Sequence, residues 1–217
     1  MHPFSPHKHE RHDEFPAVIL ASSSPRRVEL LRQANLPIFI RTPDVDEKVL
    51  RGESPRQLVK RLSELKAMSV SVQVDAEFSA GVVISADTIV VSPGVGRVLG
   101  KPKDQAEAEK MLNALSGKTH TVLTGYCLAG FGFSSEKDKK IVRVIQSKVT
   151  MRKLSKKLIR DYVQTGEPMD KAGAYAAQGL GMCFIEKITG SYTNVVGLPI
   201  SQVLDDLEHE FGIHPRF

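Results

Sequence analysis

The chain has 217 residues, of which 41% are hydrophobic, enough to bury a substantial core and to predict a globular protein. No apolar run approaches the roughly 20 residues that cross a bilayer, and the first residues lack the apolar centre of a secretory signal, so we expect a cytoplasmic protein without a membrane partner. The net charge is +5, but lysines and arginines are interleaved with acids, which argues against a nucleic-acid partner.

Residues 1–15, which show no apolar periodicity, are expected to form a flexible tail. They hold four of the seven histidines among prolines and charged residues, a composition more typical of a disordered extension than of a metal site. Residues 16–217 are expected to form a single domain. Cys127 and Cys183 lie in segments with the apolar pattern of strands, so we expect two buried thiols and no disulfide.

Strands and helices alternate along the rest of the chain. Runs rich in β-branched residues predict strands at 17–21, 82–91, 119–131 and 139–151, the last two paired around a polar turn at 134–138, and a further strand within 181–200. Amphipathic patterns predict helices at 22–36, from 54 onward, at 104–117, at 154–166 and at 201–212. We find no internal repeat of about 20 to 50 residues, which argues against a repeat protein.

Two of these helices begin with capping residues. Ser24 is placed to cap the first helix, and Pro25 takes its first position, where the missing N–H costs nothing. Ser54 opens the second helix, with Gln57 at the capping-box position. The apolar face of this second helix is predicted to consist of Leu58, Val59, Leu62 and Leu65, and Lys66 is predicted to lie at the edge of that face.

Arg26 and Arg27 stand at the start of the first helix, where the helix dipole disfavours each cation by about 0.3–1 kcal/mol. An anion is therefore expected nearby. Together with the hydroxyls of Ser22 and Ser24 and the free N–H groups of the first turn, the two guanidiniums form a candidate phosphate site. The alternative is a solvated helix start with one local salt bridge.

Asp87 interrupts an otherwise apolar strand, where an unpaired carboxylate carries a large desolvation penalty. It is either a structural side chain that hydrogen-bonds to backbone, or a ligand for Mg²⁺ that orients or deprotonates a water. Hydrolysis of a phosphoanhydride requires the second role. The acidic loop with Asp44, Asp46 and Glu47 offers a second carboxylate for such a cation.

Two further segments are candidates for binding a nucleotide. The alternative for the first, around Lys101, is a solvated turn, and the alternative for the second, residues 170–181, is a plain glycine-rich connection. Lys101 and Lys103 precede another helix start, where cations are again disfavoured unless an anion is present. In residues 170–181, glycines allow close approach of a ligand, and the Gln178 amide can read the edge of a uracil or thymine. The glycines match neither the dinucleotide-binding nor the P-loop pattern, which argues against both classes.

Taken in order, several segments closely resemble the Maf family. They span about residues 17–205 and are ASSSPRRVELL, VDE, SADTIVV, LGKPKD, LSGKTHTVLTG, EPMDKAGAYAAQGLG and GSYTNVVGLP. The resemblance implies an elongated α/β fold with a mixed central sheet and flanking helices, similar to inosine triphosphate pyrophosphatases, with two lobes around a cleft. It also implies cleavage of a nucleoside triphosphate substrate at the α–β bond with a divalent cation, Mg²⁺ or Mn²⁺.

The same motifs imply roles for individual residues. Asp87 matches the family's proton acceptor, and Glu47 matches the acidic residue near the metal. The groups that line the triphosphate in the family correspond to Ser22, Arg26, Lys66 and Lys101. The resemblance implies that the two lysines also act in catalysis. The positions that distinguish substrate branches correspond to Arg27, Thr88 and Gln178. The motifs around them resemble the dTTP/UTP branch rather than the 7-methyl-GTP branch.

The resemblance leaves three alternatives open. One is the same chemistry on 7-methyl-GTP or another modified nucleotide, and another is a nucleotide-binding regulator of cell division with little turnover. The third is an RNA-binding module, which predicts a steep salt dependence of polynucleotide affinity. The resemblance also allows a homodimer. The chain departs from the family in its histidine-bearing tail, its SPGVGRV turn and its GFGFSSEKDKK hairpin, none of which removes a motif residue.

Overall fold

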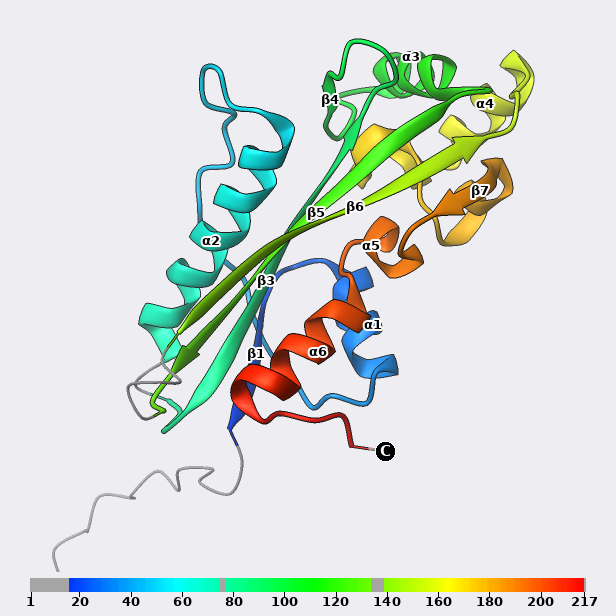
Figure 1. Ribbon diagram of the computed structural model, residues 1–217. Coiled ribbons are helices and arrows are strands. Elements are labelled where there is room, and N and C mark those ends of the chain that lie inside the picture. The colour runs from blue at the N-terminus through cyan, green and yellow to red at the C-terminus, as the bar shows by residue number, and fades with distance from the viewer. Residues whose placement is uncertain (1–15, 75–76, 134–138, 217) are drawn as a thin grey trace, which may run out of the picture.

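The computed structural model describes residues 16–74, 77–133 and 139–216, so the predicted tail at 1–15 and the predicted turn at 134–138 lie outside the described residues. An elongated mixed sheet runs through the molecule, with helices on both faces (Figure 1). This confirms the predicted α/β class. The strands are β1 (Ala17–Ala21), β2 (Phe39–Arg41), β3 (Gly81–Val91), β4 (Val98–Leu99), β5 (Thr119–Phe131), β6 (Lys140–Met151) and β7 (Ile185–Thr189).

The helices follow the predicted alternation with the strands. The α-helices are α1 (Pro25–Gln33), α2 (Pro55–Val74), α3 (Gln105–Leu115), α4 (Lys156–Gln164), α5 (Tyr192–Val196) and α6 (Ile200–Phe211). Short 3₁₀ helices lie between α4 and β7 and are η1 (Glu167–Asp170), η2 (Ala172–Ala174) and η3 (Gly179–Phe184). Among the described residues, none of these helices combines the length and the apolar content that crossing a bilayer requires.

The sheet changes from parallel to antiparallel pairing at β3. Its strand order is β2-β1-β3-β5-β6-β7, with β4 paired to β3 off this path. β1 lies parallel to β2 and β3, whereas β3, β5, β6 and β7 follow one another in antiparallel pairs. β1 ends at Ala21 opposite Ser85, so β3 continues beyond it from Ala86 to Val91. The sheet therefore has a step, where the edge of β3 between the end of β1 and the β4 pairing at Val90 lies open among the described residues.

The capping predictions are confirmed for α2 and confirmed in part for α1. The Ser54 N–H donates to Gln57 Oε1 at 2.9 Å, and the Gln57 N–H donates to Ser54 Oγ at 3.3 Å. Ser24 is the N-cap residue of α1, and Pro25 follows it as predicted, but the Ser24 side chain makes no capping hydrogen bond. Side chains therefore satisfy fewer of the backbone N–H groups at the start of α1 than at the start of α2.

The buried face of α2 differs from the predicted face at one position. Leu65 is 37% exposed, whereas its neighbour Lys66 is only 7% exposed. The prediction for Leu65 is wrong because Lys66 pairs with the buried carboxylate of Asp87 on the sheet, which turns the lysine inward and the leucine outward. The other predicted residues of the face are buried, namely Leu58, Val59 and Leu62.

The two cysteines lie in different surroundings, and only one prediction is confirmed. Cys127 is buried within β5, and burial raises the pKa of its thiol to about 12. Cys183 is exposed and belongs to η3, because the chain enters β7 only at Ile185. The predicted buried strand position of Cys183 is therefore wrong. The glycines before it favour a tight turn rather than an extended chain.

Separate apolar clusters fill the two ends of the molecule. Side chains of β1, β3, β5, α1 and α6 form one cluster, and side chains of α3, α4, η2 and the ends of β5 and β6 form another. Figure 1 shows these helices at opposite ends of the sheet, with α2 alone along the other face. A ligand at the step beside β3 therefore lies between two independently packed regions.

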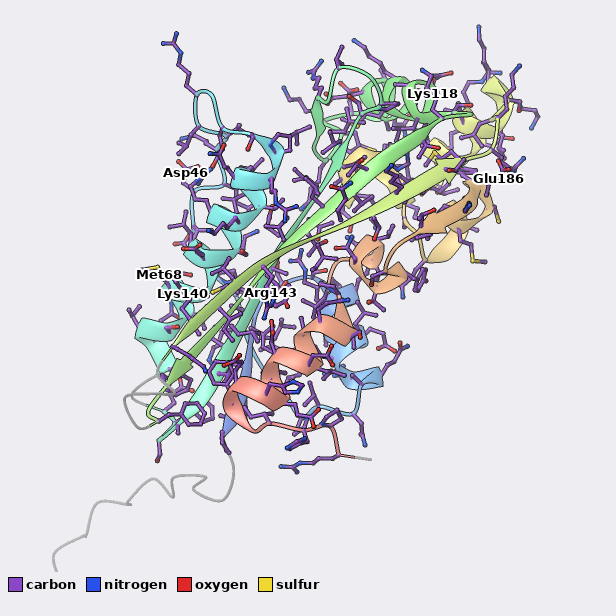
Figure 2. All side chains as sticks on the ribbon, in the orientation of Figure 1. Asp46, Met68, Lys118, Lys140, Arg143 and Glu186 are labelled. Atoms are coloured by element: carbon purple, nitrogen blue, oxygen red, sulfur yellow. The ribbon has the colours of Figure 1, made fainter. Side chains whose placement is uncertain are left out.

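A partly buried ion pair anchors α6 to the sheet. Asp206 accepts hydrogen bonds from Tyr126 Oη at 2.7 Å and from Nε and Nη2 of Arg143 at 2.6 Å. Arg143 reaches it from β6 (Figure 2). Burial alone raises the pKa of the Asp206 carboxyl, but these hydrogen bonds outweigh it and hold the pKa below its ordinary value. Asp206 is therefore ionised at neutral pH and ties β5, β6 and α6 together.

Gly125 lets α2 approach the sheet next to Asp87. It lies on β5 directly opposite Asp87 on β3. A Cβ at this position would lie 2.2 Å from the carbonyl oxygen of Val59 in α2. Opposite residues of a strand pair point to the same face of the sheet, so the missing side chain leaves the space in which Lys66 reaches Asp87.

We expect Gly125→Ala to lower the free energy of unfolding by about 3 kcal/mol, because the added methyl group forces α2 away from β5. Urea unfolding followed by circular dichroism measures this change. Gly100→Ala is the control, since a Cβ there would have nothing within 4 Å, and it should change the stability by less than about 0.5 kcal/mol. A Gly125→Ala protein as stable as the control would contradict the close approach.

Candidate active site

A cleft of about 500 Å³ opens where β3 extends past the end of β1. Crevices beyond the carboxyl ends of parallel strands are common ligand sites in α/β proteins. The walls come from the start of α1, the loop before α2, α2 itself, the loop before α3, the segment around η1 and η2, and the end of α5. The predicted site residues that line the cleft are Ser22, Arg26, Arg27, Glu47, Lys66, Asp87, Thr88 and Lys101.

The start of α1 forms one wall and is suited to an anion. The Ser24 N–H donates to Ser22 Oγ at 3.1 Å, which bends the chain from β1 into the helix. No acidic side chain lies in the first turn of α1, so the positive end of the helix dipole has no carboxylate from that turn to compensate it. Arg26 adds a further positive charge at the cleft. A phosphate group would satisfy both charges.

Arg27 joins three segments of the cleft wall. Its Nε donates to the Gly197 carbonyl at 2.8 Å, its Nη2 donates to Thr88 Oγ1 at 3.1 Å, and its Nη1 donates to Ser22 Oγ at 3.3 Å. Burial lowers the pKa of the Arg27 guanidinium, while the charge of Asp87 raises it, and an arginine stays protonated in either case. Arg27 thus acts first as a structural cross-link, and its remaining N–H donors are left for a ligand.

Thr88 continues this hydrogen-bonded chain into the sheet. Its Oγ1 lies 2.9 Å from Thr124 Oγ1, which donates to the Asn194 carbonyl at 2.9 Å. A carbonyl oxygen only accepts, so Thr124 commits its single hydrogen to Asn194, and the Thr88 hydrogen goes to Thr124 or to the Gly197 carbonyl at 3.3 Å. Thr88 also accepts from Arg27. The Thr88 hydroxyl therefore offers a ligand an acceptor and not a donor.

Lys66 lies between two carboxylates at the centre of the cleft. Its Nζ is 2.7 Å from Asp87 Oδ1 and 2.8 Å from Glu47 Oε1. The side chains of Lys66 and Asp87 are 8% and 10% exposed, whereas that of Glu47 is 58% exposed. Asp87 lies within β3, as predicted, and just past the last residue paired with β1. The strand holds its carboxylate rigidly at the cleft.

The donor set at Lys66 fits a divalent cation shared with a phosphate. Asp87 and Glu47 both contact the same nitrogen, so their carboxylates converge on a point that already holds positive charge. The described part of the chain contains no group of three or more His, Cys, Asp or Glu side chains able to hold a metal on its own. Mg²⁺ commonly binds through one or two carboxylates together with substrate phosphates. Asp87 and Glu47 match the number of carboxylates that such a site takes from a protein.

Cations also gather at the rim of the cleft, including one that the sequence analysis did not single out. Lys101 is exposed in the loop before α3, and Arg26 Nη1 lies 3.6 Å from Asp170 Oδ2. Lys171 lines the cleft as well, with its side chain 13% exposed and paired with Asp170. It lies within the glycine-rich segment 170–181, and a cation in that segment is the sequence signal that could have found it.

Three acidic or polar candidates lie outside the residues that line the cleft. Asp44 and Asp46 are exposed, and Asp46 accepts a hydrogen bond from the Lys48 N–H at 3.1 Å within its own loop. Gln178 is half-buried and follows Ala177, which does line the cleft. The structure thus brings Glu47 alone of the acidic loop to the site. The role of Gln178 in reading the base stays a prediction.

Glu167 holds the glycine-rich segment in place. Its carboxylate accepts hydrogen bonds from the N–H groups of Leu180 and Gly181, both at 2.9 Å, and from Tyr162 Oη at 2.9 Å. Burial raises the pKa of Glu167, but these donors outweigh it and leave the pKa below its ordinary value. The ionised carboxylate therefore fixes the backbone that follows the cleft-lining residues, another contribution that the sequence analysis missed.

This arrangement can bind and hydrolyse a polyphosphate. The helix start, Arg26, Lys66 and Lys101 supply positive charge, and Asp87 supplies a rigid carboxylate beside them. A carboxylate in such surroundings orients or deprotonates water, and the cations stabilise the charge that develops on phosphate oxygens.

Comparison with known proteins agrees with this chemistry. The model of the Maf-like protein family matches residues 17–210. A dTTP/UTP pyrophosphatase of Symbiobacterium thermophilum is 48% identical over 92% of this chain and 96% of its own, and one of Clostridioides difficile is 45% identical over 91% and 96%.

Among solved structures, the Staphylococcus aureus Ham1 protein aligns with a TM-score of 0.44 and 15% identity, covering 78% of this chain and 79% of that chain. A similarity at this level supports no further statement, and the expected likeness to inosine triphosphate pyrophosphatases stays a prediction. The family match, by contrast, extends over nearly all the described residues. The chain belongs to the Maf-like protein family.

Proposed function

We propose that this protein is a nucleoside triphosphate pyrophosphatase that hydrolyses dTTP and UTP to the monophosphate and pyrophosphate. The observation that carries the proposal is the contact between Asp87 and Lys66, a buried carboxylate and ammonium in a cleft that is otherwise rich in cations. The names of the relatives, dTTP/UTP pyrophosphatases, support the choice of substrate.

Asp87 is the general base in this proposal. The hydrogen bond that Oδ1 accepts from Lys66 at 2.7 Å holds the carboxylate in place, where it can direct a water toward the α-phosphorus. Arg26, Lys66 and Lys101 stabilise the charge that builds on the phosphate oxygens as pyrophosphate leaves. They do this better in a half-closed cleft than in water because the protein holds them in position before the reaction begins.

Glu47 and Asp87 are the residues that hold Mg²⁺ or Mn²⁺ in this proposal, because their carboxylates converge on one point in the cleft. When bound, the cation neutralises phosphate charge and makes the phosphorus more electrophilic. Oxygen ligands suit both metals. Lys66 balances the two carboxylates in the structure described and so keeps this part of the cleft from accumulating negative charge.

The polarity of Thr88 supports a uracil or thymine base. Its hydroxyl offers only an acceptor to the cleft, because its hydrogen goes to Thr124 or to the Gly197 carbonyl. The imide N–H of uracil or thymine is a donor, whereas the corresponding nitrogen of cytosine is an acceptor. Arg27 and Gln178 complete the set of residues to which we assign base selection. No observation in the cleft favours 7-methyl-GTP over the pyrimidine nucleotides.

We expect metal-dependent release of pyrophosphate from dTTP and UTP, and little from CTP, GTP or 7-methyl-GTP. Asp87→Asn should lower kcat by at least about 100-fold, because the general base is lost, while nucleotide binding measured by calorimetry is retained. The matched control, Asp44→Asn, removes an exposed carboxylate outside the cleft and should leave kcat unchanged. Chelation of the metal with EDTA should abolish turnover.

Other outcomes of this assay identify the alternatives. Activity on 7-methyl-GTP alone would overturn the base assignment while keeping the chemistry. Nucleotide binding without turnover would support a regulator of cell division. Unchanged turnover in Asp87→Asn would show that another group activates the water. Binding of RNA that weakens steeply with salt would point to a polynucleotide partner.

We expect Glu47→Gln to weaken Mn²⁺ binding by at least about 10-fold, because one of the two ionised ligands is lost. Paramagnetic resonance of free Mn²⁺, titrated in the presence of a non-hydrolysable α,β-imido analogue of dTTP, measures this affinity without turnover. Asp46→Asn, in the same loop but outside the cleft, is the control. Equal Mn²⁺ affinity in the two variants would remove Glu47 from the metal site.

The protein is further proposed to act as a homodimer in the cytoplasm, where nucleoside triphosphates occur. The family resemblance motivates this, and α2 offers a suitable surface. Exposed apolar side chains recur on α2 at spacings of three and four residues, namely Leu65, Met68 and Val72. Met68 lies on the side of the helix away from the sheet (Figure 2). Residues at this spacing share one helix face, and burial against a second copy removes them from water.

Light scattering after gel filtration should give twice the mass of one chain. Met68→Lys should shift the protein toward the single-chain mass, because it places a charge in the contact, whereas Gln73→Lys, elsewhere on the exposed surface of α2, should not. A single-chain mass for the unmodified protein at assay concentrations would disprove the dimer.

A further inference from the structure

Glu47 reaches the cleft from a loop without regular structure. The backbone of residues 42–50 forms neither helix nor strand, and the loop runs beside α2 (Figure 1). The Glu47 carboxylate meets the cleft at Lys66, 2.8 Å away, but its side chain is 58% exposed. Residues 46–50 are all exposed, so burial of apolar surface contributes little to holding this part of the loop. The position of Glu47 therefore depends on polar contacts of the loop.

Arg61 supplies such contacts from α2. Its Nη2 donates to the carbonyl of Lys48, the residue after Glu47, at 2.9 Å. The same guanidinium binds Glu53 through two hydrogen bonds, from Nε to Oε1 at 2.6 Å and from Nη2 to Oε2 at 2.8 Å. A planar guanidinium matches a carboxylate in this two-bond geometry, which fixes the direction of both side chains. Arg61 thus ties both ends of the segment 48–53 to α2.

Glu53 extends the contact into the backbone of the loop. Its Oε2 accepts a hydrogen bond from the Leu50 N–H at 3.0 Å, and its own N–H donates to the Leu50 carbonyl at 3.1 Å. The Glu53 side chain is 7% exposed, and the hydrogen bond from Arg61 lowers the pKa of its carboxyl, so the carboxylate is ionised at neutral pH. Arg61, Glu53 and the turn at Leu50 therefore form one hydrogen-bonded unit at the base of the loop.

The charge of Arg61 by itself opposes a cation in the cleft. The hydrogen bond to Glu53 raises the pKa of the Arg61 guanidinium most, but the charge of Asp87 raises it as well. The guanidinium and the Asp87 carboxylate therefore act on each other electrostatically, and a positive charge within this range weakens the attraction of the carboxylate for Mg²⁺ or Mn²⁺. Any benefit of Arg61 to a metal site must come from the placement of Glu47 and not from charge.

We infer that Arg61 is a positioning residue for the metal site, which holds Glu47 at the cleft through Lys48 and Glu53. The inference rests on the proposed function for the assignment of Glu47 to the metal, but not on turnover or on the identity of the base. Arg61 is not among the residues that line the cleft, so its effect on the site passes through the loop. It limits the conformational freedom that Glu47 loses when a cation binds.

The first test removes the charge of Arg61 together with its hydrogen bonds. Arg61→Gln should weaken Mn²⁺ binding by about 10-fold, because Glu47 is no longer held in place, whereas the loss of charge alone predicts tighter binding. Paramagnetic resonance of free Mn²⁺ with the α,β-imido analogue of dTTP measures this affinity. Arg61→Lys keeps the charge but not the fork of hydrogen bonds, and should weaken binding by about 3-fold. The control, Arg51→Gln, removes a charge from an exposed position in the same loop and should not weaken binding.

Three further measurements separate positioning from a general loss of structure. Binding of the analogue in EDTA, measured by calorimetry, should be unchanged in Arg61→Gln, because the cations that bind phosphate lie elsewhere in the cleft. Hydrogen exchange of the Leu50 amide, which Glu53 protects, should be at least about 10-fold faster in the metal-free variant. The double variant Glu47→Gln/Arg61→Gln should bind Mn²⁺ no more weakly than Glu47→Gln alone, because both residues act through the same contact.

Unchanged or tighter Mn²⁺ binding in Arg61→Gln would overturn the inference. A parallel loss of analogue binding in EDTA would also overturn it, because the residue would then support the fold as a whole. A double variant weaker than Glu47→Gln would mean that Arg61 acts by another route. The proposed function fails by a different result: if Glu47→Gln and Arg61→Gln both weaken Mn²⁺ binding but the unmodified protein releases no pyrophosphate, the positioning role stands without the reaction.

Discussion

The contact of Lys66 with Asp87 is the interaction on which the other features of the cleft depend. A carboxylate within an apolar strand is tolerated only if it is paired, so α2 must bring its lysine to the sheet. This approach is possible because β5 has Gly125 opposite Asp87, where any side chain would meet the backbone of α2. The same pair draws Glu47 into the cleft and leaves the rest of the acidic loop outside.

A second set of hydrogen bonds connects parts of the cleft that are distant in the sequence. Arg27 links the start of α1 to Thr88 on β3 and to the turn after α5. Thr88 and Thr124 carry this chain to Asn194. Because each hydroxyl has one hydrogen, the chain fixes which groups remain free to face a ligand. Residues that we assign to substrate selection therefore also join α1, β3, β5 and α5.

Local patterns were sufficient to predict most of the fold. The β-branched runs, the capping box at Ser54 and Gln57, and the proline at the start of α1 all depend on neighbours in the chain, and the structure has them as predicted. The errors occurred where distant groups decide. Leu65 turns outward because the sheet holds a carboxylate for the next residue, and Cys183 is exposed because the glycine-rich segment delays the start of β7.

The sequence by itself determined the order of the longer elements, without the short β2, β4 and α5, together with the family resemblance and the residue types that suit a polyphosphate. These follow from local propensity and from charges that are costly without a partner. Only the tertiary structure decided which of these charges meet. It placed Glu47 but not Asp44 or Asp46 beside Lys66, and it brought the start of α1 and the end of α5 to the same cleft. Such contacts join residues far apart in the chain, and no local pattern specifies the distance between them.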